Sequence, residues 1–190
     1  MSSEERIIFF DLETTGLNLY RDKIIEIAAI DNKDNQFHSL INPQVKLSPY
    51  ITTLTSITDD MLKEAPTLEE KKQQIIEFFD LQNENQWIIS HNNDNFDIII
   101  FMNNLNIKRE DIKSKILCNY KLSNKMSLTR NNRLITLAQY FKISNEQTHR
   151  AFDDAILVKL IFKKLKEILG VKLSITNISM DDVFNYIYNN

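Results

Sequence analysis

Residues 7–13 read Ile-Ile-Phe-Phe-Asp-Leu-Glu and lead into Thr-Thr-Gly at residues 14–16. Such a nearly continuous run of β-branched and aromatic residues predicts a central strand that is buried on both faces. Side chains alternate between the faces of a strand, so Asp11 and Glu13 should point the same way at its carboxyl end. Two carboxylates in that position repel each other unless a cation lies between them, and such oxygen ligands suit Mg²⁺ or Mn²⁺. The alternative is a strand end that carries two solvated acids.

Four further strands and four helices are expected between residues 23 and 169. Two strands that pair through a polar turn, and two short later strands, are predicted at residues 23–30, 36–41, 86–90 and 115–118. Helices are predicted at residues 67–79, 94–105, 133–141 and 150–169. Thr67 and Glu70 form a capping box at the start of the first helix, and Gly170 is expected to end the last one as a C-cap. We therefore predict an α/β fold with a mixed five-stranded sheet flanked by helices.

The chain has the size and composition of one globular domain. Of its 190 residues, 43% are hydrophobic and 26% are charged, which is ordinary for a folded protein. The single cysteine, Cys118, cannot form a disulfide within the chain, and the acidic start is unlike a signal peptide. No apolar stretch approaches the roughly 18 residues that a membrane span needs. These features predict an intracellular, cytoplasmic protein with no membrane partner.

Basic residues are concentrated in one segment. The formal net charge of −3 argues mildly against a broad, non-specific nucleic-acid binder. Residues 112–145, however, contain no Asp or Glu. The basic residues of this segment are Lys113, Lys115, Lys121, Lys125, Arg130, Arg133 and Lys142. Such a segment is suited to tracking a phosphate backbone beside an acidic site, and a solvated surface with a skewed sign explains it equally well.

A second motif, His91–Asp97, follows the strand predicted at 86–90. Asp97 falls in the first turn of an apolar helix, and Asp94 is the expected N-cap, which would leave Asp97 free to face a site. An acid at a helix N-terminus also has a purely electrostatic explanation. This motif alone does not decide between the two interpretations.

A third motif places His149 before the long C-terminal helix and Asp154 five residues later. Asp154 then reaches the same cleft as His149 from the next turn. Asp153 competes with Asp154 for the role of a ligand. A histidine at a helix start is also common as a polar cap.

In this order, the three motifs resemble those of the DEDD-type 3′→5′ exonucleases that carry a histidine in the third motif. The resemblance covers residues 6–168 and looks most like the proofreading exonuclease domains and subunits of bacterial replicative DNA polymerases. Stretches beyond the acids that support it are Asp22–Ile30, Leu54–Leu62 and Arg133–Ile143. Two positions depart from the family's pattern: Ser56 stands where glycine is usual, and Cys118-Asn119 replaces the usual Asp-Thr. Neither holds a metal in the family, so these departures bear on substrate fit more than on chemistry.

The resemblance implies a ribonuclease H-like fold and phosphodiester hydrolysis with two divalent cations, Mg²⁺ or Mn²⁺. Asp11 would bridge both cations, and Glu13 and Asp154 would complete the first site. Asp97 would hold the second cation directly or through water. His149 would take the proton from the attacking water. The product would be a nucleoside 5′-monophosphate.

The same resemblance implies contacts to the terminal nucleotide. Leu17 would act as an apolar wedge against a base, and Gly16 would allow close approach of the backbone. Phe96 suits either this role or the core. The expected substrate-binding residues are Thr14, Thr15, Gly16, Leu17, His91, Asn92 and Phe96.

Residues 1–170 are interpreted as the exonuclease domain and residues 171–190 as a C-terminal extension. Ser179 and Asp182 form a capping box there. The apolar residues that follow at helical spacing are Met180, Val183, Phe184, Ile187 and Tyr188. This pattern predicts a short amphipathic helix that docks back on the domain; a docking peptide for a polymerase or an oligomer contact is the alternative.

The implied partners are the 3′ ends of single-stranded nucleic acid, with DNA favoured over RNA, and a DNA polymerase. One alternative function is the same chemistry on RNA ends or short oligoribonucleotides. Another is a module that mainly binds nucleic acid or a polymerase. The presence of all five site residues of the family weighs against the last of these. The choice between DNA and RNA depends on how the pocket treats a 2′-hydroxyl.

Overall fold

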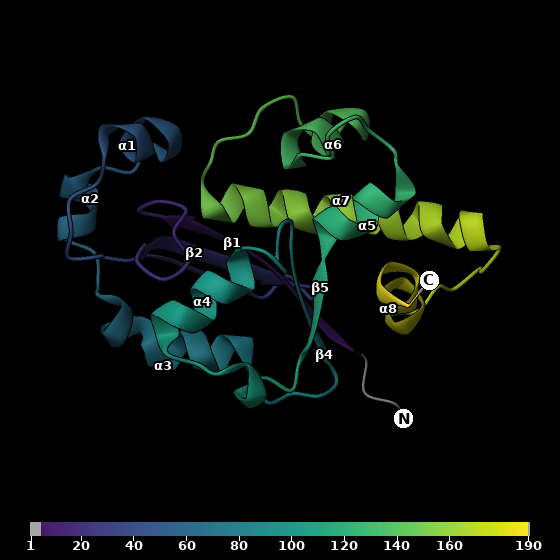
Figure 1. Ribbon diagram of the computed structural model, residues 1–190, viewed down its shortest axis with the longest axis horizontal. Helices are drawn as coiled ribbons and strands as arrows, with labels where there is room; N and C mark the ends of the chain where they lie inside the picture. The colour runs from purple at the N-terminus through teal and green to yellow at the C-terminus, as the bar shows by residue number, and fades with distance from the viewer. Residues whose placement is uncertain (1–4, 190) are drawn as a thin grey trace.

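A mixed five-stranded sheet lies between two groups of helices in the computed structural model, which describes residues 5–189 (Figure 1). The strands are β1 (Arg6–Thr14), β2 (Ile24–Asp31), β3 (Gln36–Leu40), β4 (Gln86–Ser90) and β5 (Lys115–Cys118). Their order is β3-β2-β1-β4-β5. The β1–β2 and β2–β3 pairs are antiparallel, and β1–β4 and β4–β5 are parallel. The predicted fold class is confirmed, and residues 7–13 lie in the central strand.

The helices are α1 (Pro49–Thr55), α2 (Asp59–Lys63), α3 (Leu68–Phe79), α4 (Asp97–Leu105), α5 (Asn119–Met126), α6 (Leu134–Tyr140), α7 (Ala151–Leu173) and α8 (Met180–Tyr188), with a 3₁₀ turn η1 (Arg109–Asp111). The capping box of Thr67 and Glu70 at the start of α3 is present as predicted. Helices α1, α2 and α5 were not predicted. In the part of the chain that the structure describes, no helix is long and apolar enough to cross a membrane.

Alternate residues of β1 serve two separate cores. Phe9 faces α7, where its ring centroid lies 5.6 Å from that of Phe162. Phe10 faces the other layer and packs against Phe79 of α3 at 5.5 Å and Phe101 of α4 at 6.0 Å. Because faces alternate along a strand, Asp11 and Glu13 share the face of Phe9 and lie on the α7 side.

The expectation that Gly170 ends α7 is wrong. The helix continues to Leu173 and is capped by Ser174, which adopts the left-handed conformation at φ 57°. Gly170 lies inside the helix, where an added Cβ would come within 3.1 Å of the backbone oxygen of Ile175. The glycine therefore allows the chain to turn back tightly over the helix rather than to stop it.

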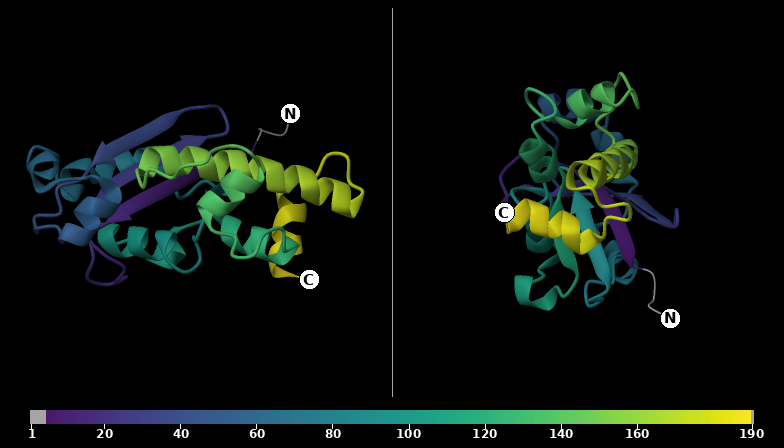
Figure 2. Two further views of the ribbon diagram at one scale, coloured as in Figure 1. Left: turned by 90° about the horizontal axis from the view of Figure 1, so that it is seen from above. Right: turned by 90° about the vertical axis from the view of Figure 1, so that its right-hand side faces the viewer.

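The predicted C-terminal amphipathic helix is present as α8, with the Ser179–Asp182 capping box. Figure 2 shows it crossing the end of α7. Met180 and Val183 are buried in the same core as α7, and the Phe184 ring lies 5.7 Å from that of Trp87. The division suggested between residues 170 and 171 falls inside α7.

Candidate active site

Four buried or half-buried carboxylates gather where β1, α4 and α7 meet. Asp11 and Glu13 come from the carboxyl half of β1. Asp97 is the first residue of α4 and only 4% exposed, and Asp154 lies in the first turn of α7 and is 2% exposed. The structure thus brings together acids from all three sequence motifs.

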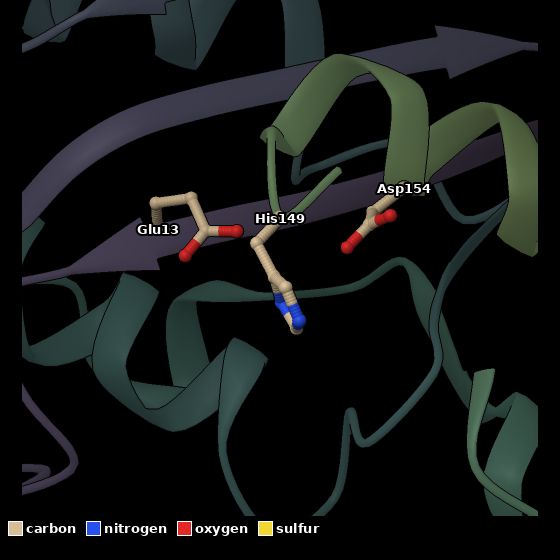
Figure 3. Close-up of side chains that lie close together, drawn as sticks. All are labelled: Glu13, His149 and Asp154. Carbon is tan, nitrogen blue, oxygen red and sulfur yellow. The ribbon is translucent and has the colours of Figure 1, made fainter. Parts of the chain in front are cut away.

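The tightest part of this group joins Glu13, His149 and Asp154, whose possible ligand atoms all lie within 4.8 Å of one another. Figure 3 shows the Glu13 carboxylate reaching from β1 and the Asp154 carboxylate from α7, with the His149 side chain between them. Asp11 and Asp97 are not part of this closest group. They lie near enough for their charges to act on it.

The electrostatics of the site disfavour four ionised acids. Burial, followed by the charges of Asp154 and Asp97, raises the pKa of Asp11 well above its usual value. Burial and Asp154 raise the pKa of Glu13 to about 8. Burial also raises the pKa values of Asp97 and Asp154 to about 6 each. A bound cation would remove this penalty by stabilising the charged carboxylates.

The donor set fits a hard divalent cation. Within residues 5–189, buried Asp154 Oδ1 has no hydrogen-bond partner, whereas its Oδ2 accepts a hydrogen bond of 2.7 Å from Gln147 Nε2. One oxygen is therefore held in place and the other is left for a ligand, an arrangement that buried polar groups avoid unless something else binds them. Carboxylate oxygens are the ligands that Mg²⁺ and Mn²⁺ prefer. Gln147 was not singled out in the sequence, because no local pattern links it to Asp154.

Asp153 and Asp154 have different surroundings. Asp153 is exposed and accepts a hydrogen bond of 2.9 Å from Thr148 Oγ1. Asp154 points into the site. Of these two neighbours, only Asp154 lies within the group of acids, and its role as a ligand stays a prediction.

His149 adopts a left-handed backbone conformation at φ 49° immediately before α7. Residues with a Cβ rarely take this conformation, and it persists only where the surroundings hold it. Among the described residues, no hydrogen bond fixes the imidazole ring of His149. The backbone turn at His149 thus sets the position from which its side chain enters the site.

Glu26 of β2 was missed by sequence reasoning. It is wholly buried, lies opposite Glu13 in the β1–β2 register and binds Arg150 and the amide of Ala151. Burial alone would raise the pKa of Glu26, but hydrogen bonds from Arg150, Ala151 and His38 outweigh it and hold the pKa below its usual value. The available signal was a single acid inside the apolar stretch Ile24–Ile30, which a buried strand does not tolerate without a partner.

The second motif differs from expectation at its cap. Asp94 is not the N-cap of α4; Phe96 holds that position without a side-chain hydrogen bond. Asp94 instead accepts a hydrogen bond of 2.8 Å from the Tyr188 hydroxyl and pairs with Lys121 at 2.5 Å. Asp94 therefore binds these distant residues instead of capping α4. Asp97 is the first residue of the helix and lies in the site.

His91 is held by a neighbouring loop. Burial lowers the pKa of His91 to about 4, so the ring is neutral, and Nε2 donates to the backbone oxygen of Asn132 at 2.9 Å. Buried Asn93 donates to the backbone oxygens of Ile88 and Leu117 and so ties the motif to β4 and β5. The assignment of His91 to substrate binding stays a prediction.

The other expected substrate-binding residues lie around the end of β1 and the start of α4. Leu17 is 83% exposed and Asn92 is exposed, whereas Phe96 is half-buried against the α3–α4 core. Thr14 Oγ1 and Thr15 Oγ1 donate to Gly16 O at 2.6 Å and to Asp22 Oδ1 at 2.8 Å, respectively. A Cβ on Gly16 would lie 2.6 Å from Asp22 Oδ2, so a side chain there would displace the carboxylate that binds Thr15 and the amide of Asn18.

The basic segment 112–145 is partly neutralised by acids from elsewhere in the chain. Lys113 pairs with Glu84 at 3.6 Å and Lys115 with Asp181 at 2.8 Å. Among residues 5–189, the exposed basic residues of this segment that make no ion pair are Arg130, Arg133 and Lys142. The idea that this segment follows a phosphate backbone stays a prediction.

Residues 8–162 match the family model for Exonuclease (RNase_T), and the chain therefore belongs to this exonuclease family. Its most similar relatives include the DNA polymerase III PolC-type proteins of Caldanaerobacter subterraneus subsp. tengcongensis, at 34% identity over 181 residues and 90% of this chain, and of Bacillus subtilis, at 34% over 179 residues and 86% of this chain. The chain spans only 12% of the length of these relatives. The resemblance to DEDD exonucleases near the polymerase proofreading domains is thereby confirmed.

Solved structures share the fold at lower identity. Exonuclease I has a TM-score of 0.75 at 16% identity, with 97% of this chain and 43% of that chain covered. Exonuclease X in complex with 5′-overhanging duplex DNA has a TM-score of 0.69 at 21% identity, with 96% and 98% covered. The nuclease domain of 3′hExo, a DEDDh family member bound to rAMP, has a TM-score of 0.68 at 16% identity, with 94% and 99% covered.

Proposed function

We propose that this chain is a 3′→5′ exonuclease that releases nucleoside 5′-monophosphates from DNA 3′ ends with the help of two divalent cations, Mg²⁺ or Mn²⁺. The observation that carries the proposal is the group of Glu13, His149 and Asp154 within 4.8 Å, flanked by Asp11 and Asp97. DNA is the favoured substrate because the relatives at 34% identity are DNA polymerases. Cytoplasmic location, where Cys118 would stay reduced, is part of this proposal.

Each site residue has a role that its position supports. Asp11, Glu13 and Asp154 would hold one cation, and Asp97 would complete the second site with Asp11. Divalent cations, when bound, supply an activated nucleophile and stabilise charge on the phosphate. His149, which lies beside the Glu13 and Asp154 carboxylates, would accept the proton of the attacking water.

The terminal nucleotide would lie against the loop after β1. Leu17 is almost fully exposed there and would stack against the base. Because the hydroxyls of Thr14 and Thr15 already donate within the loop, the backbone around Gly16 is the better candidate for polar contacts to the nucleotide. Asn92 and Phe96 would lie on the opposite side, at the start of α4.

The test uses 3′- and 5′-end-labelled single-stranded DNA, single-stranded RNA and a 3′-mismatched duplex, each with Mg²⁺, Mn²⁺ or EDTA. We expect a cation-dependent ladder from the 3′ end that Asp11→Ala and Asp154→Asn abolish. Asp153→Asn is the matched control, because it changes the neighbouring acid outside the site and should keep full activity. Intact substrates with the wild-type protein, accompanied by retained DNA binding, would show a binding module instead.

Association with a DNA polymerase is a further part of the proposal. The chain corresponds to a small share of PolC-type polymerases, so its substrate would be the 3′ end of a primer. Preference for the mismatched duplex over the matched one would support a proofreading role. Faster degradation of RNA than of DNA would instead assign the same chemistry to RNA ends.

A further inference from the structure

Glu26 has a set of partners unlike that of any other acid near the site. Its Oε1 accepts from Arg150 Nη2 at 2.7 Å and its Oε2 from the Ala151 amide at 2.9 Å, while Arg150 Nε lies 3.2 Å from Oε1 and 3.1 Å from Oε2. His38 Nε2 lies 2.7 Å from Oε1. The Glu26 side chain is 0% exposed. Both of its oxygens are thus fully occupied, in contrast to the unpartnered Oδ1 of Asp154.

The groups that Glu26 binds are those that follow His149 directly in the chain. Arg150 is the N-cap of α7 and Ala151 its first residue, and the amide of Asp154 donates to Arg150 O at 3.0 Å. Arg150 therefore links the turn that carries His149 to the first turn of α7. No hydrogen bond among residues 5–189 reaches the His149 ring, so the placement of this side chain relies on the backbone turn that precedes Arg150.

Net stabilisation alone does not explain this ion pair. The Glu26 side chain is fully buried while that of Arg150 is 31% exposed, so the cost of burying the Glu26 charge offsets much of the attraction, and an attested use of such pairs is to fix a geometry. Here the geometry to be fixed is the left-handed turn at His149, with φ 49°. A conformation of this kind is strained for a residue with a Cβ and persists only when neighbouring contacts over-determine it.

We propose that Glu26 is a positioning residue that, through Arg150 and the Ala151 amide, fixes the turn carrying His149 against the carboxylates of Glu13 and Asp154. The inference deepens the proposed exonuclease function and rests on it for its kinetic consequence. Glu26 acts through its neighbours, because both of its oxygens are already bound to Arg150, Ala151 and His38.

The test compares Glu26→Gln with a matched control on the same strand. Asp31 is also buried and lies at the far end of β2, where it pairs with Arg6 at 3.1 Å. Asp31→Asn therefore removes an equivalent buried charge away from the site. We expect Glu26→Gln to lower kcat by roughly 10- to 100-fold, the effect of misplacing a reacting group, with KM and Mn²⁺ affinity changed by no more than about threefold. Asp31→Asn should lower the melting temperature to a similar extent and keep kcat.

A double-mutant cycle identifies the route of the effect. If Glu26 works by placing His149, Glu26→Gln should cost little further activity in a His149→Ala background, because residues that act as one unit are not additive. Arg150→Lys provides a second variant whose side chain is partly exposed and keeps its charge. It should reproduce the loss in kcat even if Glu26→Gln fails to fold.

A spectroscopic readout separates this inference from the proposed function. The chain has 3 histidines, so the ring carbon-bound proton of His149 can be assigned by NMR. We expect one sharp signal in the wild type and in Asp31→Asn, and a shifted or exchange-broadened signal in Glu26→Gln. An inactive wild type with this NMR pattern would refute the exonuclease but leave the positioning role intact. An unchanged His149 signal and kcat in Glu26→Gln, or an equal loss of kcat in Asp31→Asn, would overturn the positioning role.

Discussion

Without divalent cations, the protein should become less stable as the pH rises from about 5 to about 8. The pKa values of Glu13, Asp97 and Asp154 are raised in the folded state to about 8, 6 and 6. Between the unfolded and folded pKa values, the native state therefore binds more protons than the unfolded chain. Stability is then greatest below the unfolded pKa and is lost as the pH rises through the folded pKa. The lowered pKa values of Glu26 and Asp31 act at more acidic pH, where stability falls with falling pH.

The expected size of the effect follows from these pKa values. Between pH 5 and its folded pKa of about 8, Glu13 alone corresponds to about 4 kcal/mol, because one pH unit is worth about 1.4 kcal/mol. The acids share their protons, so their contributions do not add. We expect a total loss of roughly 3–5 kcal/mol in the free energy of unfolding. At about 2–4 °C per kcal/mol for a chain of this size, the melting temperature should fall by about 6–20 °C.

Thermal unfolding in EDTA at about pH 5, 6.5 and 8 measures this slope, and the same series with Mg²⁺ or Mn²⁺ measures its reversal. Asp154→Asn removes one of the repelling charges and should flatten the slope, making the cation-free protein more stable than the wild type at about pH 8. Asp153→Asn should leave the slope as it is. Stability that is constant or rising with pH in EDTA, or that does not respond to either cation, would refute the electrostatic account of the site.

Three further substitutions have defined outcomes. Ser56→Gly should raise the free energy of unfolding by about 1 kcal/mol in urea denaturation, because Ser56 caps α1 in the left-handed conformation at φ 60°. Tyr188→Phe removes the hydrogen bond to Asp94 and should cost about 1 kcal/mol; amide exchange of residues 91–97 should speed up if α8 restrains this loop. His149→Ala should lower kcat roughly 10²- to 10⁴-fold, with near-full activity excluding it as the general base.

The fold was predictable where its signals are local. The apolar run of residues 7–13 specified the central strand, and the Thr67–Glu70 and Ser179–Asp182 capping boxes marked true helix starts. The wrong predictions, at Gly170 and Asp94, both assigned a helix cap to a residue that makes other contacts: Gly170 with the chain at Ile175, and Asp94 with Lys121 and Tyr188. Gly170 accommodates the returning backbone at Ile175, a requirement that glycine's usual role at helix ends conceals.

The candidate site was predictable for its acids but not for their support. Asp11 and Glu13 could be singled out because they are carboxylates within an apolar strand. The spacing of His149 and Asp154 places both at the start of one helix. Gln147, which orients Asp154, belongs to a loop with no regular period, so only the folded chain reveals the contact. Arg150, which pairs with Glu26, lies 124 residues away from it in the chain. No local sequence pattern connects residues at that separation.

Glu13 and Glu26 lie on adjacent strands but have different roles in our proposal: Glu26 is structural, and Glu13 belongs to the catalytic group. The two residues face each other across β1 and β2, both largely removed from water, yet their pKa values move in opposite directions. Glu26 has enough donors to stay ionised, and its charge is already compensated by Arg150. Glu13 is instead repelled by the charge of Asp154. Its ionised form would need more positive charge nearby than Arg150 supplies within the described residues. In our proposal the satisfied carboxylate of Glu26 fixes the turn of His149, while the carboxylates of Glu13 and Asp154 beside it would hold the cation.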